Sequence, residues 1–494
     1  MNRVIIVGSG GAALSCAIVL KQRNIDVTII TKTMPSASAT AQAQGGINAA
    51  LNKNDSIQEH IKDTMKAAKS YANEDIVKFM CENAPETIKW LDDLGVAFSR
   101  DTNNNIAQRF LGGASHKRAC YSSDYTGLKI LHTLYDIAIS LDIQFIYDTM
   151  LLNIIKDHNE AKGITALDLR TMEVKQFLAS KIIIATGGYA GVYLNHTTNS
   201  NYTTSDGISA AINCNIELQY LDFIQFHPTA LKLPNKHILI SESARGEGGI
   251  LITSDGKRFV DELAPRDVVA KAIYDKIKNK EDVFLDLRKL GYKKIISLMP
   301  QEYKLVKTFT NLELDKDIIP IIPSSHYSMG GIKVNKECET SLTNLYAIGE
   351  VSCNTVHGIN RLGGNSLLEI ITFGKYLGTI LDIQNVDVLE KDYKEFIQDV
   401  QYINTLYTIQ NQKNISDLKQ DFGNILYHNV GIDKNKEKLL QAKQKLLQIE
   451  EDIQLLGATN KEKIYNIEIK EIIEFKNMVT TAKEIVATSL ERIK

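Results

Sequence analysis

Apolar residues at the start of the chain first form an unbroken run and then recur at helical spacing. Val4 to Val7 is continuous and β-branched, which is typical of a strand buried on both faces of a parallel sheet. Apolar residues between Leu14 and Leu20 recur at three- and four-residue steps, and Val27 to Ile30 is a second apolar run. The pattern predicts a β-α-β unit at the start of the chain.

Two later apolar runs predict further strands of the same sheet. Residues 181–184 are followed by Ala185-Thr186-Gly187-Gly188, and residues 345–348 are followed by Gly349-Glu350. Helical periodicity marks residues 55–95 and the segment after Gly127, and short strands are expected near 144–155, 161–169 and 174–179.

The pattern changes twice along the rest of the chain. Between about 221 and 336, polar and glycine-rich turns alternate with short strands, which indicates an inserted domain. After about 385 glycines become rare, and Leu439, Leu440, Leu446, Leu447, Ile449 and Ile453 form a stripe that residues 467–491 repeat. This stripe favours an antiparallel helical domain, with a partner-binding coiled coil as the alternative. The expected division is 1–220 with 337–384, then 221–336, then 385–494.

Bulk composition excludes several classes of protein. The net charge is -2, from 57 basic and 59 acidic residues, so a dedicated nucleic-acid or membrane-surface protein is not expected. The six cysteines include no CxxC pair and no His/Cys cluster, which argues against an iron–sulfur or zinc site and fits a reducing compartment. No apolar run approaches the roughly 20 residues that span a bilayer. Since Met1 leads directly into the first strand, we expect no signal peptide and a cytoplasmic protein.

Glycines follow the first strand in the pattern of a dinucleotide-binding fingerprint. In Gly8-Ser9-Gly10-Gly11-Ala12-Ala13, Gly8 permits the tight turn and Gly10 lets the backbone approach a pyrophosphate. Ala13 allows close packing of helix and strand, and the phosphates would lie at the helix N-terminus. The second strand ends in Lys32 rather than in the acidic residue that usually binds the ribose hydroxyls, which makes NAD a poorer candidate.

Three other segments have the composition of cofactor-binding loops. Residues 36–50 are small, polar and rich in glycine, which suits a backbone wrapped around a flat ligand, although an ordinary surface loop is an equal alternative. Asp206 lies near a predicted helix N-cap. His357 to Ser366 forms a glycine-rich loop that opens an apolar helix, which again predicts an anion site.

Polar residues gather at the ends of apolar runs between 225 and 366, where loops present functional groups. Each has a structural alternative: Arg245 could pair with Glu242 or Glu247, and a lone histidine is more often a core residue. Together, three arginines and two histidines would form a receptor for a dianion, because arginine forks bind carboxylates in a bidentate manner.

These motifs, in this order, resemble the flavoprotein-subunit family of succinate dehydrogenase, fumarate reductase and L-aspartate oxidase. The resemblance covers nearly the whole chain and rests on GSGGAAL, AQGGINAAL, ATGG, QFHPTAL, SARGEGG, APRD, HYSMGG, GE and HGINRLGGNSLL. It implies an α/β fold with a Rossmann-like FAD-binding domain, an inserted α+β capping domain and a C-terminal helical domain.

The resemblance also implies roles for individual residues. Four would hold a C4 dicarboxylate: His227, Ser241, His326 and Arg361. Arg266 would protonate one substrate carbon while hydride from flavin N5 reaches the other, and Glu242 and Arg245 would relay the replacement proton. The implied FAD-binding residues are Gly8, Gly10, Gly11, Ala12, Ala13, Lys32, Thr40, Gln44, Gly45, Gly46, Ala185, Thr186, Gly187, Asp206, Glu350, Asn365, Ser366 and Leu367.

Two departures from the family pattern bear on function. Membrane-bound members attach FAD through a histidine at the position of Ala39, so noncovalent FAD is expected here. L-aspartate oxidases generally carry a glutamate where this chain has Leu111. A fumarate reductase type is therefore favoured, with an electron-transfer partner protein as a candidate partner and L-aspartate oxidase as the main alternative. A degenerate FAD-binding scaffold is a third.

Overall fold

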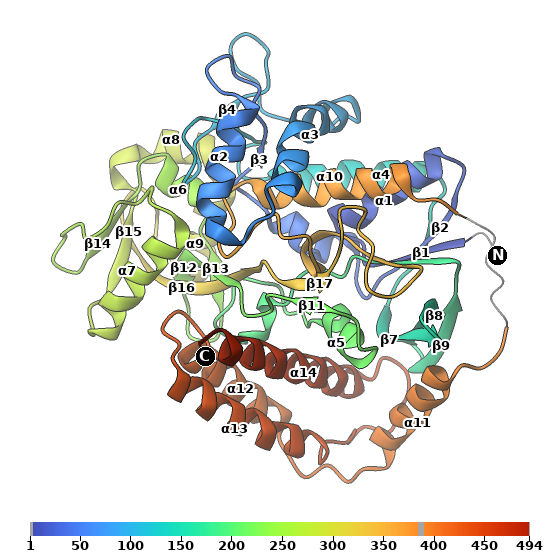
Figure 1. Ribbon diagram of the computed structural model, residues 1–494. Helices are drawn as coiled ribbons and strands as arrows, with labels where there is room; N and C mark the ends of the chain where they lie inside the picture. Colours follow the sequence, from blue (N-terminus) through green and yellow to red (C-terminus); the bar gives the residue numbers. More distant parts are fainter. Residues whose placement is uncertain (1–2, 384–389, 494) are drawn as a thin grey trace.

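The computed structural model describes residues 3–383 and 390–493 (Figure 1). Its centre is a five-stranded parallel sheet in the order β18-β10-β1-β2-β6. In that order the strands are Leu345–Ala347, Lys181–Ile184, Arg3–Val7, Asp26–Ile30 and Gln144–Ile146. The apolar runs predicted as strands therefore meet in one sheet, with β1 at its centre.

Successive residues of β1 face two different layers of the molecule. Val4 and Ile6 belong to the apolar cluster of the helical layer, whereas Ile5 and Val7 belong to the cluster of the opposite layer. The helical layer contains α1 (Gly11–Gln22), α3 (Glu74–Asp93), α4 (Thr126–Ser140) and α10 (Asn365–Ile380). The opposite layer contains the antiparallel strands β7 (Thr149–Asp157), β8 (Glu160–Asp168) and β9 (Glu173–Leu178). Burial on both faces explains why β1 is apolar from Val4 to Val7.

Thirteen further elements, most of them short, belong neither to the inserted segment's antiparallel sheet and helices nor to the C-terminal region. They are η1 (Pro35–Ala37), η2 (Ala39–Gln42), β3 (Ile47–Asn48), α2 (Ile57–Ala68), η3 (Lys69–Tyr71), β4 (Gln108–Arg109), β5 (Ala119–Cys120), η4 (Ala190–Val192), α5 (Asp206–Asn213), β11 (Leu218–Gln219), β17 (Gly331–Lys333), η6 (Gly349–Val351) and β19 (Ser352–Cys353). Of these, η1, η2, the start of α5 and η6 follow or face the carboxyl ends of the sheet strands. Ligands bind at this edge in open α/β sheets.

The segment predicted as an insertion forms its own antiparallel sheet, in the order β13-β12-β16-β15-β14. In that order its strands are His237–Leu239, Ile224–Lys232, Ile318–Ser328, Val283–Asp286 and Ile250–Thr253. Its helices are α6 (Glu242–Gly246), α7 (Arg266–Lys278), η5 (Arg288–Leu290), α8 (Gly291–Leu298) and α9 (Pro300–Thr310). An apolar cluster of its own lies within this region, which we call the cap.

The C-terminal region is helical, as the apolar stripe predicts. Its helices are α11 (Lys394–Thr408), α12 (Ile415–Asn429), α13 (Lys436–Ile453) and α14 (Ile467–Ile493). Along α13, Leu439, Leu446, Ile449 and Ile453 are buried, whereas Leu440 and Leu447 are exposed. The predicted stripe was therefore too wide, because the buried face of α13 follows only one line of residues. Helix α14 packs on α13 and also reaches α5 beside the central sheet (Figure 1).

The predicted fold class is confirmed: a Rossmann-like domain carries a cap and a helical region. The boundaries at 220/221 and 336/337 stay predictions, and the one at 384/385 lies outside the described residues. Within residues 3–383 and 390–493, no helix is both long and apolar enough to cross a membrane. The same residues contain no cluster of three or more His, Cys, Asp or Glu side chains suited to a metal ion.

Candidate active site

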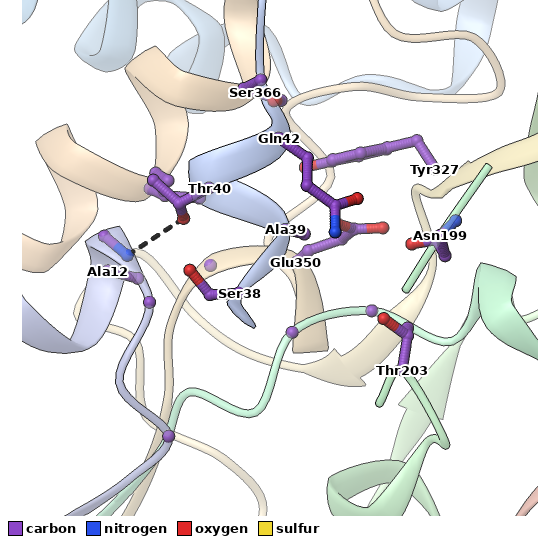
Figure 2. Close-up of a pocket in the computed structure, with 18 of the residues that line it drawn as sticks. Ala12, Ser38, Ala39, Thr40, Gln42, Asn199, Thr203, Tyr327, Glu350 and Ser366 are labelled. Carbon is purple, nitrogen blue, oxygen red and sulfur yellow. Dashed lines mark hydrogen bonds between the residues drawn. The ribbon is translucent and has the colours of Figure 1, made fainter. Parts of the chain in front are cut away.

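One elongated cavity runs from the glycine-rich turn after β1 to the cap. One end is lined by the FAD-binding fingerprint, and the other by the arginines and histidines singled out in the sequence. Segments that lie more than 300 positions apart in the sequence, from Val7 to Ile370, therefore line one cavity. Figure 2 shows Ser38, Thr40, Gln42, Glu350 and Tyr327 facing its interior. We refer below to its cofactor end and its substrate end.

Glycines make the cofactor end narrow enough for backbone contacts. Gly8 has φ +111°, and a Cβ there would overlap the carbonyl oxygen of Ala185 on the neighbouring strand. Helix α1 begins at Gly11 and directs its free N–H groups toward this space. Ala13 is buried behind this turn rather than in the lining, which fits its predicted packing role.

The loop after β2 wraps around the same end. Thr40 Oγ1 accepts from the Gly11 N–H at 3.1 Å (Figure 2). The buried Arg109 holds the loop from behind by donating to the carbonyl oxygens of Gln44 (2.7 Å) and Gly45 (2.9 Å). Ala39 lines the cavity and brings no nucleophilic side chain to it.

Glu350 lies between the two ends of the cavity. Its carboxylate accepts from the Ser328 N–H at 2.9 Å and from the Ser328 hydroxyl at 3.0 Å. Burial raises the pKa of Glu350 to about 7, because these two hydrogen bonds only partly offset the loss of water. Ser366 and Leu367 line the cavity nearby, at the start of α10.

The residues present fit the FAD implied by the sequence. Thr186 Oγ1, Ser38 Oγ and Gln44 Oε1 are buried at the cofactor end with no hydrogen-bond partner among the described residues. Buried polar groups without partners are rare in proteins, so these three are suited to the hydroxyls and ring heteroatoms of a bound dinucleotide. The glycine cradle and the N-terminus of α1 suit its pyrophosphate.

At the substrate end, Arg361 supplies a buried positive charge with no carboxylate partner among the described residues. Its guanidinium stacks on the Tyr327 ring at 4.2 Å. Burial and the nearby Arg266 lower the pKa of Arg361 to about 10, which still leaves it charged at neutral pH. An unpaired buried guanidinium is costly unless an anion binds it, so Arg361 is suited to a substrate carboxylate.

Two neutral histidines lie beside Arg361. Burial, reinforced by neighbouring positive charge, lowers the pKa of both His227 and His326 well below the ordinary value. His326 Nδ1 meets the Thr198 hydroxyl at 2.8 Å. If that hydroxyl donates, Nε2 carries the proton and can donate to a substrate carboxylate.

His227 is oriented differently. Its Nε2 lies 2.8 Å from the carbonyl oxygen of Ile240, which can only accept, so Nε2 carries the ring proton. Nδ1 is buried and has no partner among the described residues. Neutral His227 therefore offers an acceptor at Nδ1, and donating there to a carboxylate requires a second proton.

A buried network of ion pairs joins Arg266, Glu242 and Arg245. Arg266 donates to Glu242 Oε2 from Nη2 (2.6 Å) and Nε (3.0 Å), and Arg245 donates to Oε1 at 3.3 Å. Burial alone would raise the pKa of Glu242, but the two guanidiniums hold it below the ordinary value. Arg266 and Glu242 line the cavity, whereas Arg245 lies one layer behind them.

Two glycines and the amide of Gln225 hold the side chains of this ion-pair network in position. A Cβ at Gly112 or Gly363 would overlap the carboxylate of Glu242, so only glycine lets the backbone enclose it. Gln225 accepts from Arg266 Nη1 at 2.9 Å and donates to the carbonyl oxygen of Arg361 at 2.8 Å. Gln225 thus ties the two arginines to each other.

The structure also separates some predicted residues from the cavity. The Asn365 side chain is fully buried against Asn48, His60 and Thr64, so it orients the start of α10 rather than facing the lining. His357 pairs with Glu369 at 3.1 Å instead of reaching the substrate end. Sequence reasoning did not single out Thr198 and Asn199 as lining residues. The polar run from His196 to Asn201, just after the second glycine motif, was the available signal.

Comparison with known proteins identifies the family. The family described as FAD binding domain matches residues 3–367, and that described as fumarate reductase flavoprotein C-term matches residues 419–493. The 8-methylmenaquinol:fumarate reductase flavoprotein subunit of Wolinella succinogenes is 32% identical over 97% of this chain and 82% of its own length. A succinate dehydrogenase flavoprotein subunit of Rickettsia bellii is 31% identical over 99% of this chain and 88% of its own.

Solved structures agree. FrdA of E. coli quinol fumarate reductase superposes with a TM-score of 0.93 at 28% identity, covering 100% of this chain and 90% of FrdA. These matches support the fumarate reductase and succinate dehydrogenase interpretation over L-aspartate oxidase. The chain belongs to the family of FAD-dependent fumarate reductase and succinate dehydrogenase flavoprotein subunits.

Proposed function

We propose that this chain binds a C4 dicarboxylate at the substrate end and catalyses the reduction of fumarate to succinate. The observation that carries the proposal is the pair of cavity-lining arginines, Arg361 and Arg266, of which only Arg266 has a carboxylate partner among the described residues. An unpaired guanidinium suits substrate binding, whereas a paired one suits proton exchange with its partner.

The four residues expected to hold the substrate come from several elements, and of these neutral His227 needs a second proton before it can donate to a carboxylate. Arg361 comes from the loop before α10, Ser241 from the N-cap of α6, and His227 and His326 from the paired strands β12 and β16. A C4 dicarboxylate has a carboxylate at each end. One carboxylate can bind Arg361, and the other can bind near Ser241. Neutral His326 contributes a directional hydrogen bond without adding a charge.

Bound FAD supplies the hydride that one alkene carbon of fumarate receives. Arg266 holds a proton at its guanidinium and delivers it to the other carbon. Transfer from so weak an acid is feasible where water is excluded, because negative charge develops on that carbon beside a buried cation. Glu242, at 2.6 Å, is placed to return a proton to Arg266, and Arg245 links Glu242 to the cap interior.

FAD is held here without a covalent bond in this proposal. Ala39 stands at the position where the resemblance implies an attaching histidine, and it lines the cavity. A noncovalent flavin has a lower potential, which favours reduction of fumarate over oxidation of succinate. Acid precipitation should release all of the flavin; yellow colour that stays on the denatured chain would contradict this point.

An electron-transfer partner protein completes the proposed cycle. The relatives of this chain are named as flavoprotein subunits of fumarate reductases and succinate dehydrogenases. We therefore infer that reduced flavin is regenerated by a separate donor.

Anaerobic half-reactions test the proposed reaction. FAD-loaded protein is reduced with dithionite and mixed with fumarate, while oxidised protein is mixed in parallel with L-aspartate. We expect fumarate to reoxidise the flavin with formation of one succinate per flavin, and L-aspartate to leave the spectrum unchanged. Bleaching by L-aspartate with iminoaspartate formation would instead indicate an L-aspartate oxidase. No response to either compound would support the degenerate scaffold.

A further inference from the structure

Helix α14 of the C-terminal region lies against residues that line the cofactor end of the cavity (Figure 1). It packs on α5, whose first residue is Asp206. Lys32, Thr204, Ser205 and Asp206 all belong to the lining. The helical region is therefore only one side chain away from the expected position of the cofactor.

Glu474 of α14 completes the surroundings of Lys32. Lys32 Nζ lies 2.5 Å from Thr204 Oγ1, 2.7 Å from Asp206 Oδ2 and 2.9 Å from Glu474 Oε1. The ammonium donates hydrogen bonds to Thr204 and Asp206, and its charge is also paired with the Glu474 carboxylate. Lys32 therefore acts as a buried link between β2, α5 and α14 rather than as a free cation pointing into the cavity.

Asn477, one helical turn further along α14, reaches Asp206 directly. Its Nδ2 donates to Asp206 Oδ1 at 3.0 Å, and its Oδ1 accepts from the Ser209 hydroxyl at 2.9 Å. Asn477 thus bridges the first and second turns of α5. Both oxygens of the Asp206 carboxylate are consequently oriented by contacts that depend on α14.

Ser205 is held in an unfavourable backbone conformation beside the same contacts. It is a buried non-glycine residue with φ +59° and ψ +26°, in the left-handed region. Its Oγ lies 3.0 Å from the Thr481 hydroxyl of α14 and 3.4 Å from the Asn477 carbonyl oxygen. Such strain persists only where the surrounding structure enforces it, and here α14 supplies contacts that enforce it.

We propose that α14 is part of the cofactor-binding machinery: Glu474, Asn477 and Thr481 are positioning residues that hold Lys32 and the Thr204–Asp206 loop in the FAD-binding conformation. Because the same residues contact α14 and line the cavity, docking of α14 and binding of FAD stabilise each other. Coupling of this kind is reciprocal. The proposal rests on FAD as the cofactor and not on the reaction catalysed.

Substitutions on the buried face of α14 test the coupling. Asn477→Ala removes the bridge to Asp206, and Thr481→Val removes a hydroxyl with little change of shape. Thr480→Val, at the adjacent half-buried position, is the matched control. Apoprotein of each variant is titrated with FAD, and its thermal midpoint is measured with and without FAD. We expect the Kd for FAD to rise about tenfold in Asn477→Ala, less in Thr481→Val and not at all in the control.

Hydrogen exchange of α14 supplies the reciprocal readout. In the unsubstituted protein, we expect added FAD to slow amide exchange between residues 474 and 481, and this slowing should shrink in Thr481→Val. A merely structural role would lower the thermal midpoint equally in apoprotein and holoprotein, with an unchanged Kd. That result, or α14 exchange that is indifferent to FAD, would overturn the proposal whatever substrate the enzyme uses. If Asn477→Ala does not fold, Thr481→Val alone decides between the two outcomes.

Discussion

The two ends of the cavity are lined by different kinds of chemical groups. At the cofactor end, glycines and small residues bring the backbone close to the ligand, as Gly8 does against Ala185. At the substrate end, large buried charges hold one another in place, as Arg266 and Glu242 do at 2.6 Å. The cofactor end thus depends on the absence of side chains that would crowd the backbone, whereas the substrate end depends on each buried charge having an oppositely charged partner. Substitutions at the two ends should therefore fail in different ways.

Crowding the backbone should have the largest effect. In Gly8→Ala the new Cβ would overlap the Ala185 carbonyl in a left-handed backbone, so we expect a loss of about 3 kcal/mol or more in unfolding free energy. FAD incorporation should fall to background with it. Gly256→Ala is the control, since Gly256 has φ +79° but nothing within 4 Å, and strain alone should cost about 1 kcal/mol. Equal losses of unfolding free energy in the two variants would contradict this, since they would show that the close contact of Gly8 with the Ala185 carbonyl oxygen adds no cost.

Removing a charge partner should spare the cofactor and damage the chemistry. Glu242→Gln leaves the buried Arg245 and Arg266 without their shared carboxylate. We expect fumarate turnover to fall by about 10²- to 10³-fold, since Gln cannot relay a proton, while FAD content stays normal. Steady-state kinetics and the flavin-to-protein ratio check both parts. Retained turnover would remove Glu242 from the proposed proton path.

Glu350, between the two ends of the cavity, provides a contrasting carboxylate. Its pKa is raised to about 7, so folded protein holds a proton that the unfolded chain releases above about 4.5. The stabilisation is fully present below the unfolded pKa and is lost as the pH rises through about 7. Between pH 5 and pH 8 the unsubstituted apoprotein should therefore lose about 3 kcal/mol of unfolding free energy that Glu350→Gln does not lose. Denaturant titrations at both pH values give this difference, and parallel pH profiles would contradict it.

Thr198→Val should give the smallest effect. It removes the hydroxyl that meets His326 Nδ1 at 2.8 Å, so the imidazole loses the contact that fixes its tautomer. Loss of one such hydrogen bond is worth about 1 kcal/mol, which predicts a roughly fivefold rise in KM for fumarate with little change in kcat. A fall in kcat at constant KM would instead connect Thr198 with the chemical step.

The same difference explains which parts could be predicted from the sequence. The cofactor end depends on local order: strand, glycines, helix, all within residues 3–22, so its motif is visible in one segment. The order of motifs also carried the substrate residues, because the family resemblance placed Arg266, Glu242 and Arg361 together. Spacing alone could not do so, since these residues lie on α7, α6 and the loop before α10.

Contacts between distant segments were not visible. Asn365 reads as a loop residue at a helix start, but its side chain is used by Asn48 and His60, which lie more than 300 positions away. Leu440 and Leu447 match the helical period of α13 yet face solvent, because none of the described elements covers that side. The link from Lys32 to Glu474 likewise joins two segments whose sequences give no sign of each other.

The central claim is that Arg266 donates a proton to a substrate held by the other anchors. The most direct measurement is the rate at which fumarate reoxidises the dithionite-reduced flavin of Arg266→Gln, with Arg258→Gln as an exposed-arginine control. We predict normal FAD content in both variants, an unchanged rate in the control and a loss of at least about 10³-fold in Arg266→Gln. Reoxidation of Arg266→Gln within about tenfold of the unsubstituted rate would contradict the account.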